Sequence, residues 1–156
     1  MFEVEFHGRG GQGLYLASQV LAYAAFLDGK YPQTFPEFTA ERRGAPISAF
    51  LRIDTKPIRI RCRIYRPNAI LVFDPAFLPQ ITEILERTKP TGSLLVNSKN
   101  DVQVERKIRI AHIDSDGIAE EFGLSSMEGH HMGNMAMLGA FCRFTGMVTL
   151  ESLVEA

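Results

Sequence analysis

The sequence predicts an α/β fold of three layers, in which helices cover a mixed, mostly parallel sheet. Two observations lead to this prediction. Short apolar stretches of strand length alternate along the chain with stretches of helical periodicity. The first strand also runs through a loop of four glycines directly into the first helix. Because 156 residues is an ordinary length for one domain, we expect a single domain over residues 1–156.

The chain begins with a strand, a glycine loop and a helix. Residues 2–7 alternate between apolar and polar side chains, which is the period of a half-buried strand. Apolar residues recur at steps of three and four over residues 14–27, which predicts a helix, and Gly29 is expected to end it. Between them lie Gly8, Arg9, Gly10, Gly11, Gln12 and Gly13.

The next stretch predicts a hairpin with one charged face. Pro32 and Pro36 indicate that residues 31–38 form an extended, interrupted segment and not a central strand. Residues 47–53 read as a strand, and after a turn residues 58–64 alternate strictly between apolar and charged side chains. The charged side of this second strand carries Arg59, Arg61 and Arg63.

The second half of the chain continues the alternation of strands and helices. Residues 69–73 form an unbroken apolar run, which is typical of a parallel strand buried on both faces. Asp74 and Pro75 are favoured residues at the start of a helix. Further strands are expected within residues 92–98 and 107–114, and further helices over residues 116–122, over residues 131–144 and after Thr149.

The composition argues against several classes of protein. A net charge of −1 argues against general nucleic-acid binding, and no uncharged apolar stretch approaches the roughly 18 residues of a membrane span. The start of the chain lacks the pattern of a secretory signal, so we expect a cytoplasmic protein. Cys62 and Cys142 are the only cysteines and lie far apart, so zinc sites and iron–sulfur clusters lack a ligand set in this chain.

The glycine loop predicts contact with an anionic group. Gly8, Gly10 and Gly13 fit the pattern G-x-G-x-x-G, after a strand and before a helix. Backbone without Cβ atoms lets a phosphate approach the N–H groups and the positive end of the helix dipole. The alternative is that the glycines only permit a tight turn and close packing.

Two features weaken the interpretation of this loop as a dinucleotide site. Such a site needs an acidic residue about 20 positions later, at the end of the second strand, to bind a ribose. Asp28 has this spacing but lies at the end of the predicted helix, and Glu37 lies beside Pro36. The Gly-Lys-Ser/Thr of a P-loop is absent as well.

Three stretches together resemble a known family. They are "GRGGQG" near the start, "FPEFTAERRGAPISAFLRID" at residues 35–54 and "GNMAMLGAF" at residues 133–141. In this order and at these separations they resemble the gamma subunit of 2-oxoacid:ferredoxin oxidoreductases, and the form "ERRGAP" resembles the pyruvate branch. The resemblance covers essentially the whole chain.

The resemblance implies a multi-subunit enzyme that converts a 2-oxoacid such as pyruvate to an acyl-coenzyme A and carbon dioxide. The enzyme passes two electrons to ferredoxin, or runs in reverse. Thiamine diphosphate, Mg and the iron–sulfur clusters would lie on companion subunits of the alpha, beta and delta types. The gamma chain would be architectural and lie near coenzyme A, so we assign no catalytic residue to it.

Under this resemblance, two groups of residues are candidates for binding. Residues 8–13 are candidates for the phosphate-rich end of coenzyme A, with Arg9 as a charge and Gln12 as a hydrogen-bonding side chain. The alternative is a loop packed against a neighbouring subunit. Arg42 and Arg43 are candidates to bind a carboxylate of another subunit or an anionic ligand. The alternative is a local ion pair with Glu41.

Other features leave alternatives open. The arginines of residues 59–66 form either a solvated strand face or a contact with an acidic partner, with the solvated face favoured. Adjacent His130 and His131 do not make a metal site, because neighbours on a helix point about 100° apart. A stand-alone nucleotide-binding or coenzyme A-binding module and an NAD-dependent oxidoreductase are the competing functions.

Overall fold

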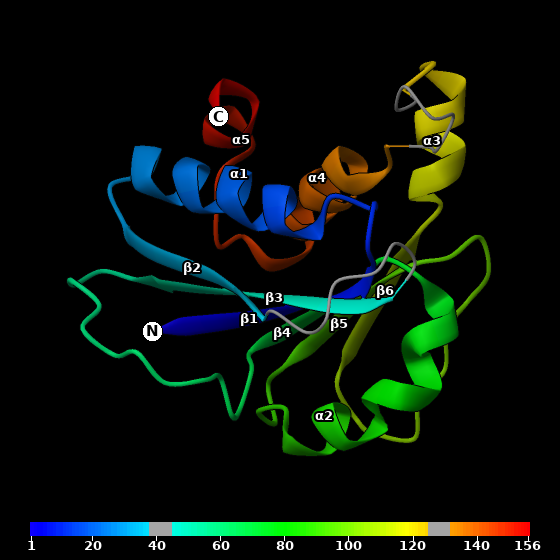
Figure 1. Cartoon of the computed structure of the whole chain (residues 1–156), viewed down its shortest axis with the longest axis horizontal. Coiled ribbons are helices and arrows are strands. Elements are labelled where there is room, and N and C mark those ends of the chain that lie inside the picture. The colour runs from blue at the N-terminus through cyan, green and yellow to red at the C-terminus, as the bar shows by residue number, and fades with distance from the viewer. Residues whose placement is uncertain (38–44, 125–131) are drawn as a thin grey trace.

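The computed structural model describes residues 1–37, 45–124 and 132–156. Within them, six strands form one sheet in the order β2-β3-β1-β4-β5-β6 (Figure 1). The strands are β1 (Phe2–Arg9), β2 (Tyr31–Glu37), β3 (Pro46–Asp54), β4 (Ala69–Val72), β5 (Ser93–Asn97) and β6 (Arg109–Ile113). The helices are α1 (Leu14–Leu27), the 3₁₀ helix η1 (Pro75–Ile81), α2 (Thr82–Arg87), α3 (Ser115–Glu121), α4 (Asn134–Thr145) and α5 (Leu150–Glu155).

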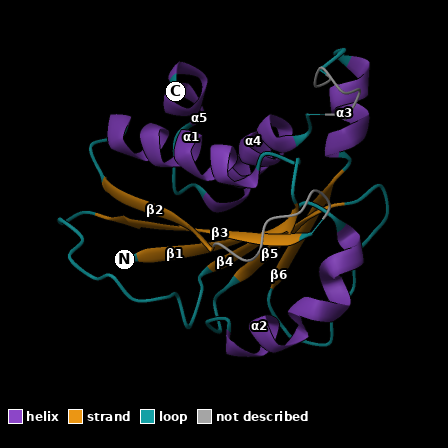
Figure 2. Ribbon diagram, in the orientation of Figure 1, coloured by secondary structure: helices purple, strands orange, loops and turns teal. Residues whose placement is uncertain are grey.

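The sheet is mixed, as the sequence predicts. Strands β1, β4, β5 and β6 pair in parallel, while β3 runs antiparallel between β1 and β2. Helices α1, α4 and α5 lie over one face, and η1 with α2 lies over the other (Figure 2). The three-layer α/β architecture is therefore confirmed.

Strand β4 lies at the centre of the core because both of its faces are apolar. Ala69 and Leu71 pack into the cluster beneath α1 and α4, whereas Ile70 and Val72 pack against η1 and α2. All four side chains are buried. An unbroken apolar run thus behaves as expected for a parallel strand between two helical layers.

Strand β1 differs from the half-buried strand predicted for it. Val4 and Phe6 face the α1 core, as the alternation requires. On the other face, Glu5 is fully buried and His7 is 8% exposed. The Glu5 carboxylate lies 2.9 Å from Nη1 of Arg87, and His7 Nε2 lies 3.1 Å from Glu5 Oε2. Charge pairing therefore replaces solvent at this polar face.

The predicted hairpin partner over residues 58–64 is wrong, because this stretch forms no strand. Strand β3 has β1 on one side and β2 on the other, so neither of its edges is open to another strand. Residues 55–68, named here the arginine segment, instead cover the polar face of β1 and β3, as the bond from Arg52 Nη2 to the Cys62 carbonyl at 2.7 Å shows.

Strand β2 is a continuous edge strand. Its prolines, Pro32 and Pro36, are accommodated because β2 pairs only with β3. Phe35 of β2 stacks on Phe50 of β3 with ring centroids 5.2 Å apart. The expectation that this stretch is extended and not central is confirmed, but it is a regular strand of seven residues.

The helix boundaries follow the predicted signals. Asp74 accepts a hydrogen bond from the Ala76 N–H at 2.9 Å and begins η1. Pro79 cannot donate a backbone hydrogen bond to the preceding turn, which accounts for a 3₁₀ helix there and for an α-helix only from Thr82.

The caps of two other helices are also as expected. Gly29, with φ of +74°, follows α1. Thr149 caps α5 by accepting from the Ser152 N–H at 3.2 Å.

Candidate functional site

The glycine loop lies where β1 ends and α1 begins. The Gln12 N–H donates to the Arg9 carbonyl at 3.2 Å, which closes a turn. The Gly10 N–H donates to the Ala45 carbonyl at 3.0 Å and ties the loop to the start of β3. Gly11 and Gly13 have φ of +99° and +71°, which are left-handed conformations that favour glycine.

The glycines of the loop serve two different purposes. A Cβ on Gly8 would lie 2.5 Å from Gln12 Oε1, and a Cβ on Gly13 would lie 2.6 Å from Asn134 Nδ2. A Cβ at either position would displace the Gln12 or Asn134 side chain, and the left-handed φ of Gly13 also favours glycine. A Cβ on Gly11 would meet no atom within 4 Å among the described residues. The backbone at Gly11 is open, as contact with an incoming ligand requires.

The N-terminus of α1 carries no capping side chain and no acidic residue among the described residues. Gly13 is its N-cap and offers no side-chain hydrogen bond, and the first turn has no acidic residue. The helix is 14 residues long, so its dipole places partial positive charge at this end. The close packing expected from the sequence is present at Gly8 and Gly13, and contact with an anion stays a prediction for this loop.

Arg9 bridges the loop to the strand end next to it. Its guanidinium forms an ion pair with Asp74, the residue that caps η1, and lies 5.1 Å from the ring centroid of Phe77. The Arg9 side chain is 46% exposed. An anionic ligand at the loop would therefore compete with Asp74 for this guanidinium.

Both the oxygen and the nitrogen of the Gln12 side-chain amide form hydrogen bonds. Its Oε1 accepts from the Arg9 N–H at 2.7 Å, and its Nε2 donates to the Phe73 carbonyl at 3.3 Å. The side chain thus fixes the loop against the end of β4. Gln12 therefore positions the backbone of the loop.

The loop lies at a topological switch point, where the helices that follow two neighbouring parallel strands lie on opposite faces of the sheet. Strand β1 continues into α1 on one face, whereas its parallel neighbour β4 continues into η1 and α2 on the other (Figure 1). Open α/β sheets bind ligands outside the carboxyl ends of the strands at such a point. The Arg9–Asp74 ion pair joins the last residue of β1 to a residue that follows β4 at this point.

Asn97, at the end of β5, extends this hydrogen-bonded edge. Its Nδ2 donates to the Phe73 carbonyl at 3.1 Å and to Asp116 Oδ2 at 2.9 Å, and its Oδ1 accepts from the Ser115 N–H at 3.0 Å. A cavity of about 20 Å³ remains beside Asn97 and Gln12. This volume accommodates about one water molecule, so a larger ligand has to lie over the outer surface of the loop.

Sequence reasoning missed Asp74 and Asn97 as parts of this edge. The sequence pattern assigns Asp74 only to the start of a helix and gives Asn97 no role beyond the strand expected within residues 92–98. Both directly follow or end an apolar strand, and the carboxyl ends of parallel strands meet at one edge. Their position at the carboxyl ends of neighbouring strands is the sequence signal from which this edge could be predicted.

Arg42 and Arg43 lie outside the described residues, as do His130 and His131. The chain becomes described again at Ala45, whose carbonyl accepts from Gly10 of the glycine loop.

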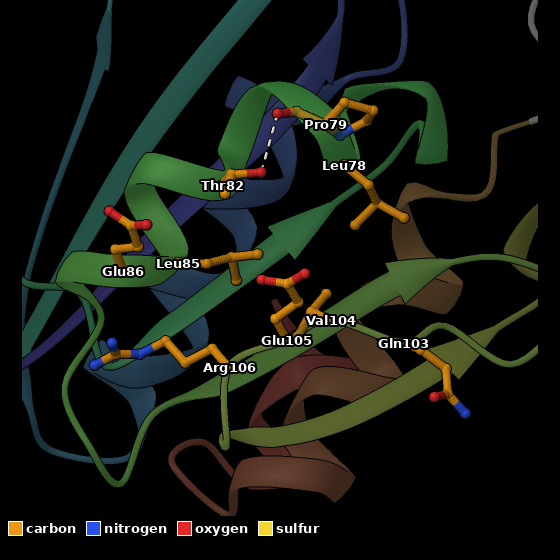
Figure 3. Close-up of a pocket in the computed structure, with 9 residues that line it drawn as sticks. All are labelled: Leu78, Pro79, Thr82, Leu85, Glu86, Gln103, Val104, Glu105 and Arg106. Carbon is orange, nitrogen blue, oxygen red and sulfur yellow. Dashed lines mark hydrogen bonds between the residues drawn. The ribbon is translucent and has the colours of Figure 1, made fainter.

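A larger groove lies elsewhere, between η1 with α2 and residues 103–106 (Figure 3). Its volume is about 570 Å³, with an apolar floor that includes Leu85 and Val104, and with Glu86, Glu105 and Arg106 along it. On one wall the Thr82 hydroxyl donates to the Pro79 carbonyl at 3.1 Å. The groove shares no lining residue with the glycine loop and was not predicted from the sequence. Its mixed charges single out no ligand class.

The described residues hold no group of three or more His, Cys, Asp or Glu that could bind a metal ion. Of the cysteines, Cys62 is exposed and Cys142 is buried. No helix within the described ranges is long and apolar enough to cross a membrane.

A family model described as "Pyruvate ferredoxin/flavodoxin oxidoreductase" matches residues 3–156. The chain belongs to this family. The gamma subunit common to the pyruvate and ketoisovalerate oxidoreductases of Pyrococcus furiosus is 45% identical over 162 residues, which cover 100% of this chain and 84% of that protein. The interpretation of the three sequence motifs as those of a gamma subunit is confirmed.

Solved structures of similar proteins have the same fold as this chain. Pyruvate oxidoreductase subunit PORC from Thermotoga maritima is 37% identical, with a TM-score of 0.83 over 99% of this chain and 82% of that one. The fold alone is shared with the 2-oxoglutarate:ferredoxin oxidoreductase of Magnetococcus marinus, determined with 2-oxoglutarate, coenzyme A and succinyl-CoA bound. That match has a TM-score of 0.78 at 19% identity and covers 99% of this chain and 26% of that one.

Membership of the family fixes the class of reaction. The chain is a gamma subunit of a multi-subunit pyruvate, or 2-oxoacid, ferredoxin oxidoreductase. It is a non-catalytic part of an oxidoreductase, as the sequence predicts, and not a free-standing NAD-dependent enzyme.

Proposed function

We propose that this gamma subunit is an architectural domain, formed by residues 1–156, that holds its glycine loop against the phosphate-bearing end of coenzyme A. In this proposal, companion subunits of the alpha, beta and delta types carry thiamine diphosphate, Mg and the iron–sulfur clusters. Ferredoxin receives the electrons through the complex. The chain binds the substrate coenzyme A and provides no group to the chemistry.

The observation that carries the proposal is the open N-terminus of α1 beside Gly11. The N-cap provides no side-chain hydrogen bond, and a Cβ at Gly11 would meet no described atom within 4 Å. Phosphate oxygens are the ligands that a helix N-terminus favours. The Magnetococcus marinus enzyme, which shares the fold, was determined with coenzyme A bound, and this supports the substrate coenzyme A as the source of the phosphate.

We propose that arginines add charge to this contact. Arg9 is partly exposed and can exchange the Asp74 carboxylate for a phosphate, which accepts two of its N–H groups at once. Arg42 and Arg43 come shortly before Ala45, whose carbonyl accepts from the Gly10 N–H. We propose that they bind the same anionic group or a carboxylate of a companion subunit.

The topology gives a physical reason against a dinucleotide in the same place. The acidic residue that binds a ribose lies at the end of a strand adjacent to β1. In this sheet β3 separates β2 from β1, so Glu37 at the end of β2 is two strands away. Asp28 ends α1 and accepts hydrogen bonds from Thr149 and Ser152 of α5.

The test is a Gly11→Ala substitution in the assembled complex. The added methyl group lies over the open backbone, and the KM for coenzyme A should rise about fivefold, equivalent to about 1 kcal/mol of phosphate interaction with a helix N-terminus. The KM for the 2-oxoacid should not change. Steady-state kinetics with each substrate varied in turn makes the measurement.

Gly29→Ala is the matched control. Gly29 also has a left-handed φ, +74°, and a Cβ there would also meet no described atom within 4 Å. It therefore reproduces the backbone strain at the opposite end of α1. If the loop packs against a neighbouring subunit instead, Gly11→Ala weakens assembly and leaves the KM for coenzyme A unchanged, which would refute the proposal.

A further inference from the structure

The arginine segment concentrates positive charge on one surface. Residues 55–68 contain five of the chain's 17 basic residues and no Asp or Glu, although the chain as a whole has a net charge of −1. The basic residues are Lys56, Arg59, Arg61, Arg63 and Arg66, and all five are exposed. The surface therefore carries a strong local field that the overall charge conceals.

The backbone of the segment is held rigidly from beneath. Gln33 Nε2 donates to the Ile60 carbonyl at 2.9 Å, and Arg52 Nη2 donates to the Cys62 carbonyl at 2.7 Å. Arg87 Nη1 donates to the Tyr65 carbonyl at 2.8 Å. Three side chains from β2, β3 and α2 thus bind three carbonyls along the segment. The exposed arginines are presented on a fixed backbone and not on a free loop.

Three of the four arginines of the segment form no ion pair within the described part of the chain. Arg63 lies 3.5 Å from Glu37, and Arg59, Arg61 and Arg66 form no ion pair with any described residue. The sequence suggested that alternating charge keeps one face of a strand wet. Because the segment is not a strand, protection of a sheet edge does not explain this charge, and the alternatives are solvation of the exposed arginines and contact with an acidic partner.

Apolar side chains and a hollow lie among these charges. Ile60 is 43% exposed and Tyr65 is 67% exposed. A hollow of about 270 Å³ beside the segment is lined by Gln33, Thr34, Phe35 and Arg61. It combines an aromatic wall with a guanidinium, which suits a side chain that has an apolar body and an acidic end. Arg and Tyr are also the residues enriched where proteins contact each other.

We propose that the arginine segment is the docking surface for an acidic face of a companion subunit of the oxidoreductase complex. The positive charge selects an acidic partner by complementarity. The fixed backbone, the exposed Tyr65 and the hollow beside Arg61 fit a lasting contact between subunits better than a brief encounter with an electron carrier. Arginine also pairs with carboxylates through two parallel hydrogen bonds, which fixes orientation as well as attraction.

The test replaces the three arginines that have no ion pair, Arg59→Ser, Arg61→Ser and Arg66→Ser, in a tagged chain co-expressed with its companion subunits. Removing three exposed contacts should raise the dissociation constant of the chain from the complex roughly tenfold at about 0.1 M salt. The salt dependence of dissociation should also become shallower. A dilution series followed by mass photometry measures both.

The control variant removes three exposed basic residues elsewhere, by Lys99→Ser, Lys107→Ser and Arg143→Ser, and so changes the net charge equally. It should assemble like the parent chain. Circular dichroism of each complex checks that the fold is kept. Equal dissociation constants for both variants and the parent would overturn the proposal.

Two further readouts separate this proposal from other possibilities. An unchanged dissociation constant with a raised KM for ferredoxin would mean that the segment contacts the electron acceptor, and would also overturn the proposal. The KM for coenzyme A should stay unchanged in complexes saturated with the variant chain. The Gly11→Ala variant should instead raise the KM for coenzyme A and leave the dissociation constant of the chain unchanged. The two proposals can therefore fail independently.

Discussion

Asp28, at the end of α1, accepts hydrogen bonds from the backbone N–H and the hydroxyl of Thr149, at 3.0 and 2.7 Å. The two residues are 121 positions apart in the sequence. The same carboxylate accepts from the Ser152 hydroxyl at 2.6 Å and from Lys30 Nζ at 3.1 Å. One buried carboxylate therefore fastens the last helix to the end of the first.

Replacing this carboxylate should destabilise the fold. Asp28→Ala leaves the Thr149 and Ser152 donors without their partner, and we expect a loss of about 2 kcal/mol in the free energy of unfolding. Denaturant titration of the parent and variant chains measures this loss. Glu120→Ala removes an exposed carboxylate from α3 and should change stability by less than about 0.5 kcal/mol. Equal effects of the two substitutions would contradict the role given to Asp28.

Asp28 should also make stability depend on pH. Burial alone would raise its pKa, but hydrogen bonds from Ser152 and Thr149, and then Lys30, outweigh burial and hold the pKa well below the ordinary value. A carboxyl whose pKa is lowered by folding stabilises the protein above its unfolded pKa, which is about 3.9. This contribution is complete at neutral pH and is lost as the pH falls below about 4.

The measurement for this pH dependence is urea denaturation from neutral pH down to about pH 3. The parent chain should lose stability more steeply than Asp28→Asn, which cannot titrate at this position. Parallel curves for the two chains would show that Asp28 contributes nothing to acid sensitivity.

The two cysteines should differ in reactivity. Burial, with a smaller effect of the Asp28 charge, raises the pKa of Cys142 to about 11, so its thiol stays protonated at neutral pH. Cys142 is also buried, whereas Cys62 is exposed on the arginine segment. Iodoacetamide should therefore label Cys62 in the separated folded chain and both cysteines after unfolding. Peptide mass spectrometry assigns the labels, and labelling of Cys142 in the folded chain would refute this prediction.

Arg52 should be essential to the arginine segment. It is 1% exposed, and its guanidinium binds Glu3, Gln33 and the Cys62 carbonyl. Arg52→Met leaves the Cys62 carbonyl without this donor and leaves Glu3 with Lys89 at 3.5 Å, and we expect a loss of about 2 kcal/mol in stability.

The matched control for Arg52→Met is Arg66→Met, which removes an exposed arginine of the segment. Its effect on unfolding should stay below about 0.5 kcal/mol. Protease digestion of the native chains provides a second readout, because release of the segment should create new cleavage sites within residues 55–68 only in the Arg52 variant. A resistant Arg52 variant of normal stability would contradict this account.

Much of the fold was predictable because the deciding signals are local. The glycine loop, the cap at Asp74 and the apolar run of β4 each act within a few residues, and each predicted its element correctly. The candidate site was predicted only in part. Its loop was found, but Asp74 as the partner of Arg9 depends on two strands, 65 residues apart, lying side by side.

The sequence by itself determined the family, through three motifs in order, and the type of most helices and strands. Only the tertiary structure decided where the alternating residues 58–64 lie. Alternation states which side chains share a face, but a strand also needs an open neighbour to pair with. Both edges of β3 were already occupied by β1 and β2. The segment therefore covers a buried charged face and exposes its arginines.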